Sequence, residues 1–301
     1  MHTPLVESFH HGSPGRFFLK PESLQPIGSF KLRGAYNLIS SLPDEDRRRG
    51  VITYSSGNHA QGVAYAARAL GVKAVIVMPN NAPQVKVDST RGMGAEIVFV
   101  GPASSERKDR AEQLAAEHGY EIVPPYNDER IIAGAGTMGL EIAQDLPDVE
   151  LVLAPIGGGG CISGIASGVK LSGSKARVVG VEPTLANDAQ QSFRSGSIVQ
   201  LKAEEVSRTI ADGLRTQSVG EINFEHIRKF VDDVVSVTED EILEAMRWMA
   251  LHVKLVAEPS GAVTVAAFLK HRSELPESAK TVAVVTGGNA DPALLAKVIG
   301  S

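Results

Sequence analysis

The sequence has a single cysteine, Cys161, and no long hydrophobic run, and both shortages narrow what the protein can be. One cysteine cannot form a disulfide within the chain, which suits a reducing cytosol, so we expect a cytoplasmic protein. The N-terminus lacks the basic start and the apolar stretch of a signal peptide. No apolar stretch approaches the roughly 20 residues that a membrane-spanning helix needs, so no membrane association is expected.

Positive charge and clustered metal ligands are scarce as well. The formal net charge is -5 at pH 7, so no basic surface is expected to bind nucleic acid. The eight histidines are scattered and do not have zinc-site spacing. What remains is a globular composition, with 43% hydrophobic and 22% charged residues, and a length of 301 residues that fits roughly two domains.

Short apolar runs alternate with helical patterns along the chain. This alternation predicts an α/β fold with parallel-rich sheets flanked by helices. Four strand–helix units over 50–126 predict a small domain at 46–127, inserted into a large domain formed by 1–45 and 128–301. The cleft between two such domains is a usual ligand site. The predicted strands are 50–55, 72–79, 95–101, 121–126, 149–157, 177–183, 232–241 and 281–288, and helices are predicted at 58–70, 83–92, 104–119 and 128–146.

The segment PIGGGGCISG (155–164) places four glycines between a predicted strand and a helix. Glycines let backbone N–H groups approach an anion, and the helix N-terminus adds partial positive charge. The spacing fits neither a P-loop nor a dinucleotide fingerprint, and no lysine follows the glycines. The pattern therefore predicts a phosphate held by the backbone alone, as in a cofactor monophosphate. The alternative is a tight turn at a sheet edge.

Three further segments carry polar groups at similar junctions. GSFKLRG (28–34) places Lys31 ahead of a helical stretch, as either a solvated surface lysine or one that forms an imine with a carbonyl cofactor. SSGNHAQG (55–62) offers N–H groups, an amide and a serine hydroxyl, or simply caps a helix. VVTGGNAD (284–291) delivers the Thr286 hydroxyl to a turn. Together these are the parts needed to hold pyridoxal phosphate by imine, phosphate, ring hydroxyl and ring nitrogen.

In their order along the chain, these motifs resemble those of the fold-type II pyridoxal-phosphate enzymes, specifically the serine/threonine dehydratases and serine racemase. The resemblance implies their two-domain architecture, which is similar to that of the tryptophan synthase β chain. It runs almost end to end, through TPL (3–5), LQPIGSFKLRGA (24–35), SSGNHAQG, IAGAGT (132–137), PIGGGG, VEPTLAND (181–188), IADGL (210–214), AEPSGA (257–262) and TGGN (286–289).

The resemblance implies a role for each motif. Lys31 would be the imine lysine and the base for the Cα proton. Thr286 would face the pyridine nitrogen, and its neutral hydroxyl would favour expulsion of a β-hydroxyl over a long-lived carbanion. Asn58 would bond the ring hydroxyl, and with Ser55 and His59 it would also lie around the substrate carboxylate. The rest of the implied cofactor site consists of Phe30, Gly157, Gly158, Gly159, Gly160, Cys161 and Gly213.

Ser56 is the position that separates activities within the resembled family. Many dehydratases carry alanine there, whereas racemases carry a serine that protonates the face opposite the lysine. A serine also appears in the 3-hydroxyaspartate dehydratases. Racemisation requires two oppositely placed acid/base groups, so Ser56 is implied as the second one. The alternative is that Ser56 merely caps the helix.

The segment VEPTLAND matches the divalent-cation site of the resembled family. Glu182 and Asp188, with the carbonyl of Ala186, would be its protein ligands. Carboxylate and carbonyl oxygens suit Mg²⁺, Mn²⁺ or Ca²⁺. Without the resemblance, the two acids would be ordinary loop residues.

The sequence therefore predicts a lyase that eliminates water from a hydroxy amino acid such as L-threonine or L-serine, giving a 2-oxo acid and ammonia. Serine racemase and 3-hydroxyaspartate dehydratase remain alternatives, and the resemblance implies a homodimer. A nucleotide-binding regulator without catalysis is disfavoured by GSFK and by the lack of an acidic residue some twenty positions after the glycines.

Overall fold

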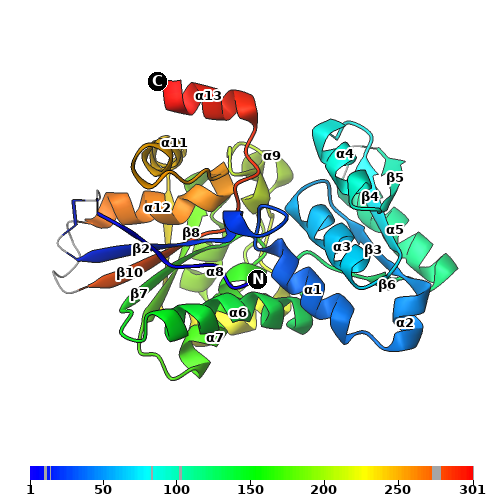
Figure 1. Cartoon of the computed structure of the whole chain (residues 1–301), viewed down its shortest axis with the longest axis horizontal. Helices are drawn as coiled ribbons and strands as arrows, with labels where there is room; N and C mark the ends of the chain where they lie inside the picture. The colour runs from blue at the N-terminus through cyan, green and yellow to red at the C-terminus, as the bar shows by residue number, and fades with distance from the viewer. Residues whose placement is uncertain (10–11, 14, 83, 102–103, 273–278, 301) are drawn as a thin grey trace. The chain divides into compact units, whose positions relative to one another are not determined.

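The computed structural model describes residues 1–9, 12–13, 15–82, 84–101, 104–272 and 279–300 (Figure 1). The chain divides into two compact units, Met1–Phe30 with Ala135–Ser301, and Lys31–Gly134. The sequence predicted domain boundaries after residues 45 and 127, whereas the chain passes from one unit to the other after residues 30 and 134. The helix that begins at Lys31 and the first residues of the helix Glu129–Asp145 therefore lie in the smaller unit.

The larger unit is built on a six-stranded sheet with the order β1-β2-β10-β7-β8-β9. Only β1 runs antiparallel to its neighbour, and every other pair of strands in this sheet is parallel. The strands are β1 (Val6–Ser8), β2 (Arg16–Pro21), β7 (Leu151–Pro155), β8 (Arg177–Pro183), β9 (Asp233–Val237) and β10 (Lys280–Val285).

Helices cover both faces of this sheet, because alternate residues of each strand point to opposite sides. Phe18 and Val282 pack in one core with residues of α6, α7 and α10, whereas Phe17 and Ala283 pack in another with residues of α11 and α12. Figure 1 shows α6 and α7 on one side and α11 and α12 on the other. The helices of this unit are α6 (Glu129–Asp145, from Ala135 on), α7 (Gly160–Leu171), α8 (Asp188–Ser195), α9 (Ala203–Val206), α10 (Glu221–Phe230), α11 (Glu239–Trp248), α12 (Pro259–His271) and α13 (Pro292–Gly300), with short turns η1 (Glu22–Leu24), η2 (Thr184–Ala186), η3 (Asp212–Leu214) and η4 (Met249–Val253).

The smaller unit has an all-parallel four-stranded sheet with the order β5-β4-β3-β6. Ile52, Val75 and Val77 of this sheet pack against Ala111 and Leu114 of α5. The strands are β3 (Val51–Tyr54), β4 (Ala74–Pro79), β5 (Glu96–Val100) and β6 (Glu121–Ile122), and the helices are α1 (Lys31–Ser41), α2 (Asp44–Arg49), α3 (Asn58–Ala69), α4 (Gln84–Gly92) and α5 (Ser104–His118).

The predicted fold class is confirmed, and the differences at element ends have local causes. The strand predicted over 121–126 ends at Ile122, since Pro124 and Pro125 cannot donate to a ladder. The strand predicted over 232–241 ends at Val237, because Thr238 caps α11 and its Oγ accepts from Glu241 N. Residue 83, where one helix was predicted to begin, lies outside the described residues.

Two strands, β1 and β2, were not predicted. The reason is visible in β2, where the charged Lys20 interrupts the apolar run although its side chain is completely buried. Its Nζ lies 2.6 Å from Glu141 Oε2 of α6, so the charge is paired inside the fold. A buried lysine charge needs an oppositely charged partner, and here that partner, Glu141, is distant in the sequence, so the sequence pattern did not indicate the strand.

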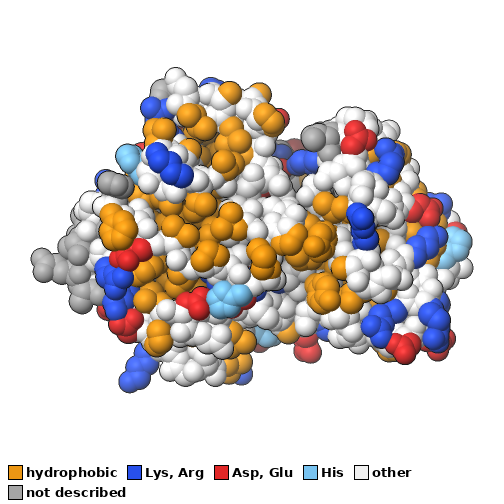
Figure 2. Space-filling model, in the orientation of Figure 1, with side chains coloured by type: hydrophobic (Ala, Val, Ile, Leu, Met, Phe, Trp, Pro, Cys, Tyr) orange, Lys and Arg blue, Asp and Glu red, His pale blue; other side chains and the backbone are white. Residues whose placement is uncertain are grey.

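The last features of the fold are the charge pattern of one face and the polarity of the helices. On the face drawn in Figure 2, basic side chains lie among acidic ones and form no large area of one sign. Within the part of the chain that the structure describes, every helix is too short or too polar to cross a membrane.

Candidate active site

The glycine run forms the turn between β7 and α7, at the carboxyl end of the sheet in the larger unit. Gly159 has φ +96°, a left-handed conformation that favours glycine. A Cβ atom on Gly159 would lie 2.7 Å from Asn223 Cβ, so space also demands glycine there. No described side chain caps α7, and its first turn contains no acidic residue. The first N–H groups of α7 are therefore available to an anion.

Contacts with neighbouring segments position this turn. The N–H of Gly220 donates to Gly158 O at 3.0 Å. A Cβ atom on Gly157 would lie 3.3 Å from Gly213 O, so the backbones of Gly157 and Gly213 lie side by side. Cys161 is 8% exposed and packs in the core beneath α7.

Thr286 stands directly after β10 and is 4% exposed. Its hydroxyl donates to Ser260 O at 3.4 Å, and its carbonyl accepts from Phe30 N at 3.0 Å. Ser260 Oγ in turn accepts from Gly213 N at 2.9 Å. Ser260 therefore links Thr286, the residue implied for the ring nitrogen, to Gly213, which lies beside the glycine turn. Sequence reasoning gave Ser260 no role, although it lies in the motif AEPSGA.

The TGGN turn also holds the segment that leads to Lys31. Ser29 pairs with Gly287 in an antiparallel bridge, and Gly288 N donates to Gly28 O at 2.9 Å. Asn289 Nδ2 donates to Ile27 O at 2.8 Å. The half-buried Phe30 packs against the core that contains Val282. Two segments more than 250 residues apart in the sequence thus set the backbone just before Lys31.

Lys31 is the first residue of α1 in the smaller unit, and it is half-buried. Its Nζ donates to Pro125 O at 2.7 Å. Helix α3 packs tightly on the start of α1, because a Cβ atom on Gly62 would lie 3.1 Å from the carbonyl carbon and oxygen of Lys31. This arrangement is not that of a solvated surface lysine.

His59 lies beside the same segment that accepts from Lys31. Its Nε2 is 2.9 Å from Val123 O, which also accepts from Thr53 Oγ1 at 2.7 Å. Burial, and then the charge of Lys31, lower the pKa of His59 to about 3. The neutral ring therefore donates from Nε2 to Val123, so the ring is directed into the unit. In the first turn of α3, the backbone N–H of His59 is the group that suits a carboxylate.

The turn between β3 and α3 carries Ser55, Ser56 and Asn58, all half-buried. Gly57 is the N-cap of α3, and no described side chain caps the helix. Ser55 Oγ accepts from Gly57 N at 3.3 Å, whereas the Ser56 hydroxyl makes no hydrogen bond with the described residues. Capping of α3 therefore does not account for Ser56.

The two groups of residues occupy equivalent places in the two sheets. In the larger sheet, β8 and β9 lie on one side of β7, and β10 lies on the other side. The glycine turn follows β7, and Thr286 follows β10. In the smaller sheet β4 and β6 flank β3 in the same way, and the serine turn and Pro125 follow β3 and β6. Such switch points, at the carboxyl ends of parallel strands, are where open α/β sheets bind ligands.

Glu182 and Asp188 form a buried pair of carboxyl groups at the end of β8 and the start of α8. Glu182 accepts from Ala189 N at 3.1 Å and from Gln190 N at 2.7 Å. Neither oxygen of Asp188 accepts a hydrogen bond of normal geometry from the described residues, although the N–H groups of Asp188 and Val219 lie near enough to oppose the rise of its pKa. Burial, and then repulsion by Asp188, raise the pKa of Glu182, and burial raises the pKa of Asp188 to about 7. Unpartnered buried oxygens of this kind fit a cation ligand set, together with the buried Ala186. The described residues contain no cluster of three or more acidic, histidine or cysteine ligands.

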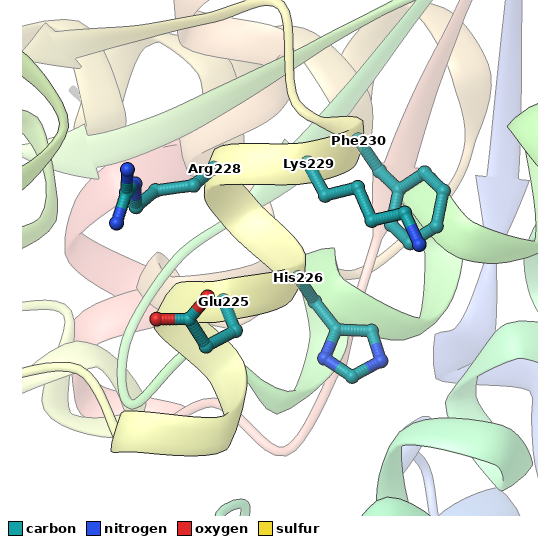
Figure 3. Close-up of a pocket in the computed structure, with 5 residues that line it drawn as sticks. All are labelled: Glu225, His226, Arg228, Lys229 and Phe230. Carbon is teal, nitrogen blue, oxygen red and sulfur yellow. The ribbon is translucent and has the colours of Figure 1, made fainter.

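An open hollow of about 450 Å³ lies on α10 (Figure 3). His226 and Phe230 line it, and their ring centroids are 6.2 Å apart. Lys229 Nζ is 5.0 Å from the centroid of the Phe230 ring. Every lining residue comes from this one helix, so the hollow carries no converging set of polar groups from different elements.

Comparisons with known proteins place the chain in a family. The sequence matches the family described as pyridoxal-phosphate dependent enzymes over residues 1–287. It is 43% identical over 286 residues to the L-threonine ammonia-lyase of Thermotoga maritima, covering 95% of this chain and 70% of that protein. It is 42% identical over 276 residues to the L-threo-3-hydroxyaspartate ammonia-lyase of Saccharomyces cerevisiae, covering 92% and 83%. The structure of maize serine racemase is similar with a TM-score of 0.93 at 36% identity, covering 100% of this chain and 92% of that chain.

Proposed function

The chain belongs to the family of pyridoxal-phosphate-dependent enzymes. On this premise we propose that it removes water from a hydroxy amino acid such as L-threonine or L-serine, and that hydrolysis of the released aminoacrylate product gives a 2-oxo acid and ammonia. The family prediction made from the order of the motifs is confirmed. The observation that carries the proposal is the half-buried Lys31, whose Nζ is held 2.7 Å from Pro125 O at the switch point of the smaller sheet.

The residues present fit the cofactor. Phosphate suits the uncapped start of α7 and the glycine turn, because N–H groups and the helix dipole favour an anion. The Thr286 hydroxyl suits the ring nitrogen, and the Asn58 amide suits the ring hydroxyl. When bound, pyridoxal phosphate supplies a carbonyl for a covalent link to Lys31 and a ring that delocalises the electron pair left at the substrate Cα.

The side chains of this protein then bind the substrate and move its protons. The ε-amine of Lys31 takes the Cα proton as general base. The N–H groups at the start of α3, with Ser55 and Asn58, hold the substrate carboxylate. Thr286 brings no charge to the ring nitrogen, which favours departure of the β-hydroxyl. Fixed orientation and aligned N–H donors contribute most of the rate.

A substrate panel on the purified protein tests this proposal. It contains L-threonine, L-serine, D-serine and the 3-hydroxyaspartate isomers, with pyridoxal phosphate and Mg²⁺ present. We expect 2-oxo acid and ammonia from L-threonine or L-serine. A protein that binds the cofactor but forms no 2-oxo acid from any member of the panel contradicts the proposal.

A second candidate is an enzyme that also racemises serine or dehydrates 3-hydroxyaspartate. It is favoured by Ser56, which does not cap α3 and makes no hydrogen bond with the described residues, so its hydroxyl suits a second acid/base group. Ser56→Ala should then lose racemisation and use of D-serine but keep elimination from L-serine. Equal loss of both reactions argues against two opposed bases.

Glu182, Asp188 and the carbonyl of Ala186 are proposed to hold a divalent cation, Mg²⁺, Mn²⁺ or Ca²⁺. The support is the burial of two carboxyl groups whose oxygens need a positive charge to remain ionised. We also propose a cytoplasmic homodimer, as the single cysteine and the resemblance suggest. Light scattering after size-exclusion chromatography tests the dimer.

A further inference from the structure

Asn223 is a buried amide that the active-site assignments above leave unexplained. Its side chain is completely buried, and neither Nδ2 nor Oδ1 has a hydrogen-bond partner among the described residues. Among the described side chains, only Asn223 and Asp188 have two buried polar atoms that lack a hydrogen-bond partner of normal geometry. A buried amide that leaves both groups unpaired is costly, so such a residue calls for a ligand.

The position of Asn223 points to that ligand. Asn223 lies in the first turn of α10, and its Cβ is 2.7 Å from the point where a Cβ atom of Gly159 would stand. Its own carbonyl accepts from Ser163 Oγ of α7 at 3.1 Å. Gly220, which precedes α10, donates to Gly158 O at 3.0 Å. The start of α10 therefore contacts Gly158 and Gly159 of the glycine turn and Ser163 of α7.

Two independent features thus meet at the glycine turn. One is the uncapped N-terminus of the 12-residue helix α7, with N–H groups suited to an anion. The other is the unpartnered amide, whose Nδ2 is a donor of two hydrogen bonds. Donor groups from two helices around one turn suit an acceptor-rich, negatively charged ligand such as a phosphate monoester.

We propose that Asn223 is a further phosphate-binding residue, whose Nδ2 donates to the phosphate monoester held at the glycine turn. This inference rests on the proposed cofactor site. It explains why an amide is buried without a partner inside the fold, since the bound anion supplies the acceptor. It also makes the contribution of Asn223 depend on the phosphate group and not on the pyridine ring.

The test compares pyridoxal phosphate with pyridoxal, which lacks the phosphate. Dissociation constants are measured from the visible absorbance of the wild-type protein, of Asn223→Leu, which keeps the approximate shape, and of Asn223→Asp, which places a negative charge beside the anion. A hydrogen bond to a charged group corresponds to about 10- to 100-fold in affinity. We expect a loss of that size for pyridoxal phosphate in Asn223→Leu, a larger loss in Asn223→Asp, and pyridoxal affinity within about twofold of the wild type.

A cofactor-free measurement gives a second readout that needs neither Lys31 nor turnover. Inorganic phosphate should raise the unfolding temperature of the wild-type apoprotein and should do so less in Asn223→Leu. Without phosphate, Asn223→Leu should be at least as stable as the wild type, because it removes an unpaired buried amide. Thr281→Val is the matched control, since Thr281 is also completely buried with an unpartnered hydroxyl, at the start of β10, and it should leave phosphate affinity unchanged.

Three results would overturn the role of Asn223. They are unchanged affinity for pyridoxal phosphate in Asn223→Leu, equal losses for pyridoxal phosphate and pyridoxal, and a loss of apoprotein stability without a phosphate-specific effect. A wild-type protein that binds neither cofactor form would overturn the proposed function itself. The two failures are therefore distinguishable.

Discussion

Replacing His59 by glutamine should make the protein less sensitive to acid. The His59 ring is buried and neutral, and burial together with the charge of Lys31 lowers its pKa from 6.5 to about 3. In the unfolded chain His59 binds a proton below pH 6.5, whereas in the folded protein it stays neutral until about pH 3. Because the unfolded chain binds the extra proton, the free energy of unfolding falls as the pH is lowered through this range. The stability that depends on neutral His59 is therefore complete above pH 6.5 and is lost as the pH falls toward 3.

The magnitude follows from the size of this shift. Each pKa unit corresponds to about 1.4 kcal/mol, and pH 4.5 lies about two units below the pKa of an unfolded histidine. Between pH 7 and pH 4.5 the wild type should therefore lose about 2 to 3 kcal/mol that His59→Gln does not lose. Acid also protonates carboxylates, but these contribute to both proteins and cancel in the difference.

Urea unfolding of both proteins at pH 7 and pH 4.5 measures this difference. Thr53→Val is the matched control, because Thr53 donates to the same Val123 carbonyl but cannot titrate. Its cost, about 1 to 2 kcal/mol for a lost buried hydrogen bond, should be the same at both pH values. If the wild type and His59→Gln lose equal free energy on acidification, the neutral buried histidine is refuted.

Three further predictions concern the site directly. Lys31→Ala should fold but lose turnover and the visible absorbance on addition of pyridoxal phosphate, and a variant that kept both would remove Lys31 from its role. Gly159→Ala should destabilise the protein in urea unfolding by roughly 1 to 2 kcal/mol more than Gly173→Ala. Both residues have positive φ, +96° and +88°, but an added Cβ atom would contact other atoms only at Gly159. Equal effects of the two substitutions would mean that the turn relaxes around the new methyl group. Asp188→Asn should abolish the rise in unfolding temperature that Mg²⁺, Mn²⁺ or Ca²⁺ gives to chelator-treated protein, whereas Asp240→Asn, at an exposed acid in the first turn of α11, should keep it; a rise that survives in Asp188→Asn places the cation elsewhere.

Local backbone requirements were readable from the sequence. The glycine run predicted a turn between a strand and a helix, and Gly159 adopts the left-handed conformation that such a turn needs. Alternation of apolar runs and helical patterns predicted the parallel sheets, because that pattern reflects burial on both faces of each strand. The order of the motifs was sufficient for the family, since each motif reflects a demand that a few neighbouring residues make together.

Only the tertiary structure decided which distant groups meet. Lys20 reads as a charge that breaks a strand until Glu141 is seen to pair with it inside the fold. Ser260 gains a role only from its contacts with Gly213 and Thr286, and the ring of His59 turns inward because Val123 accepts from it. The sequence determines local conformation through steric and hydrogen-bonding preferences of adjacent residues. Burial, pKa and partnership depend on atoms brought close from remote positions, so they are decided by the packed fold.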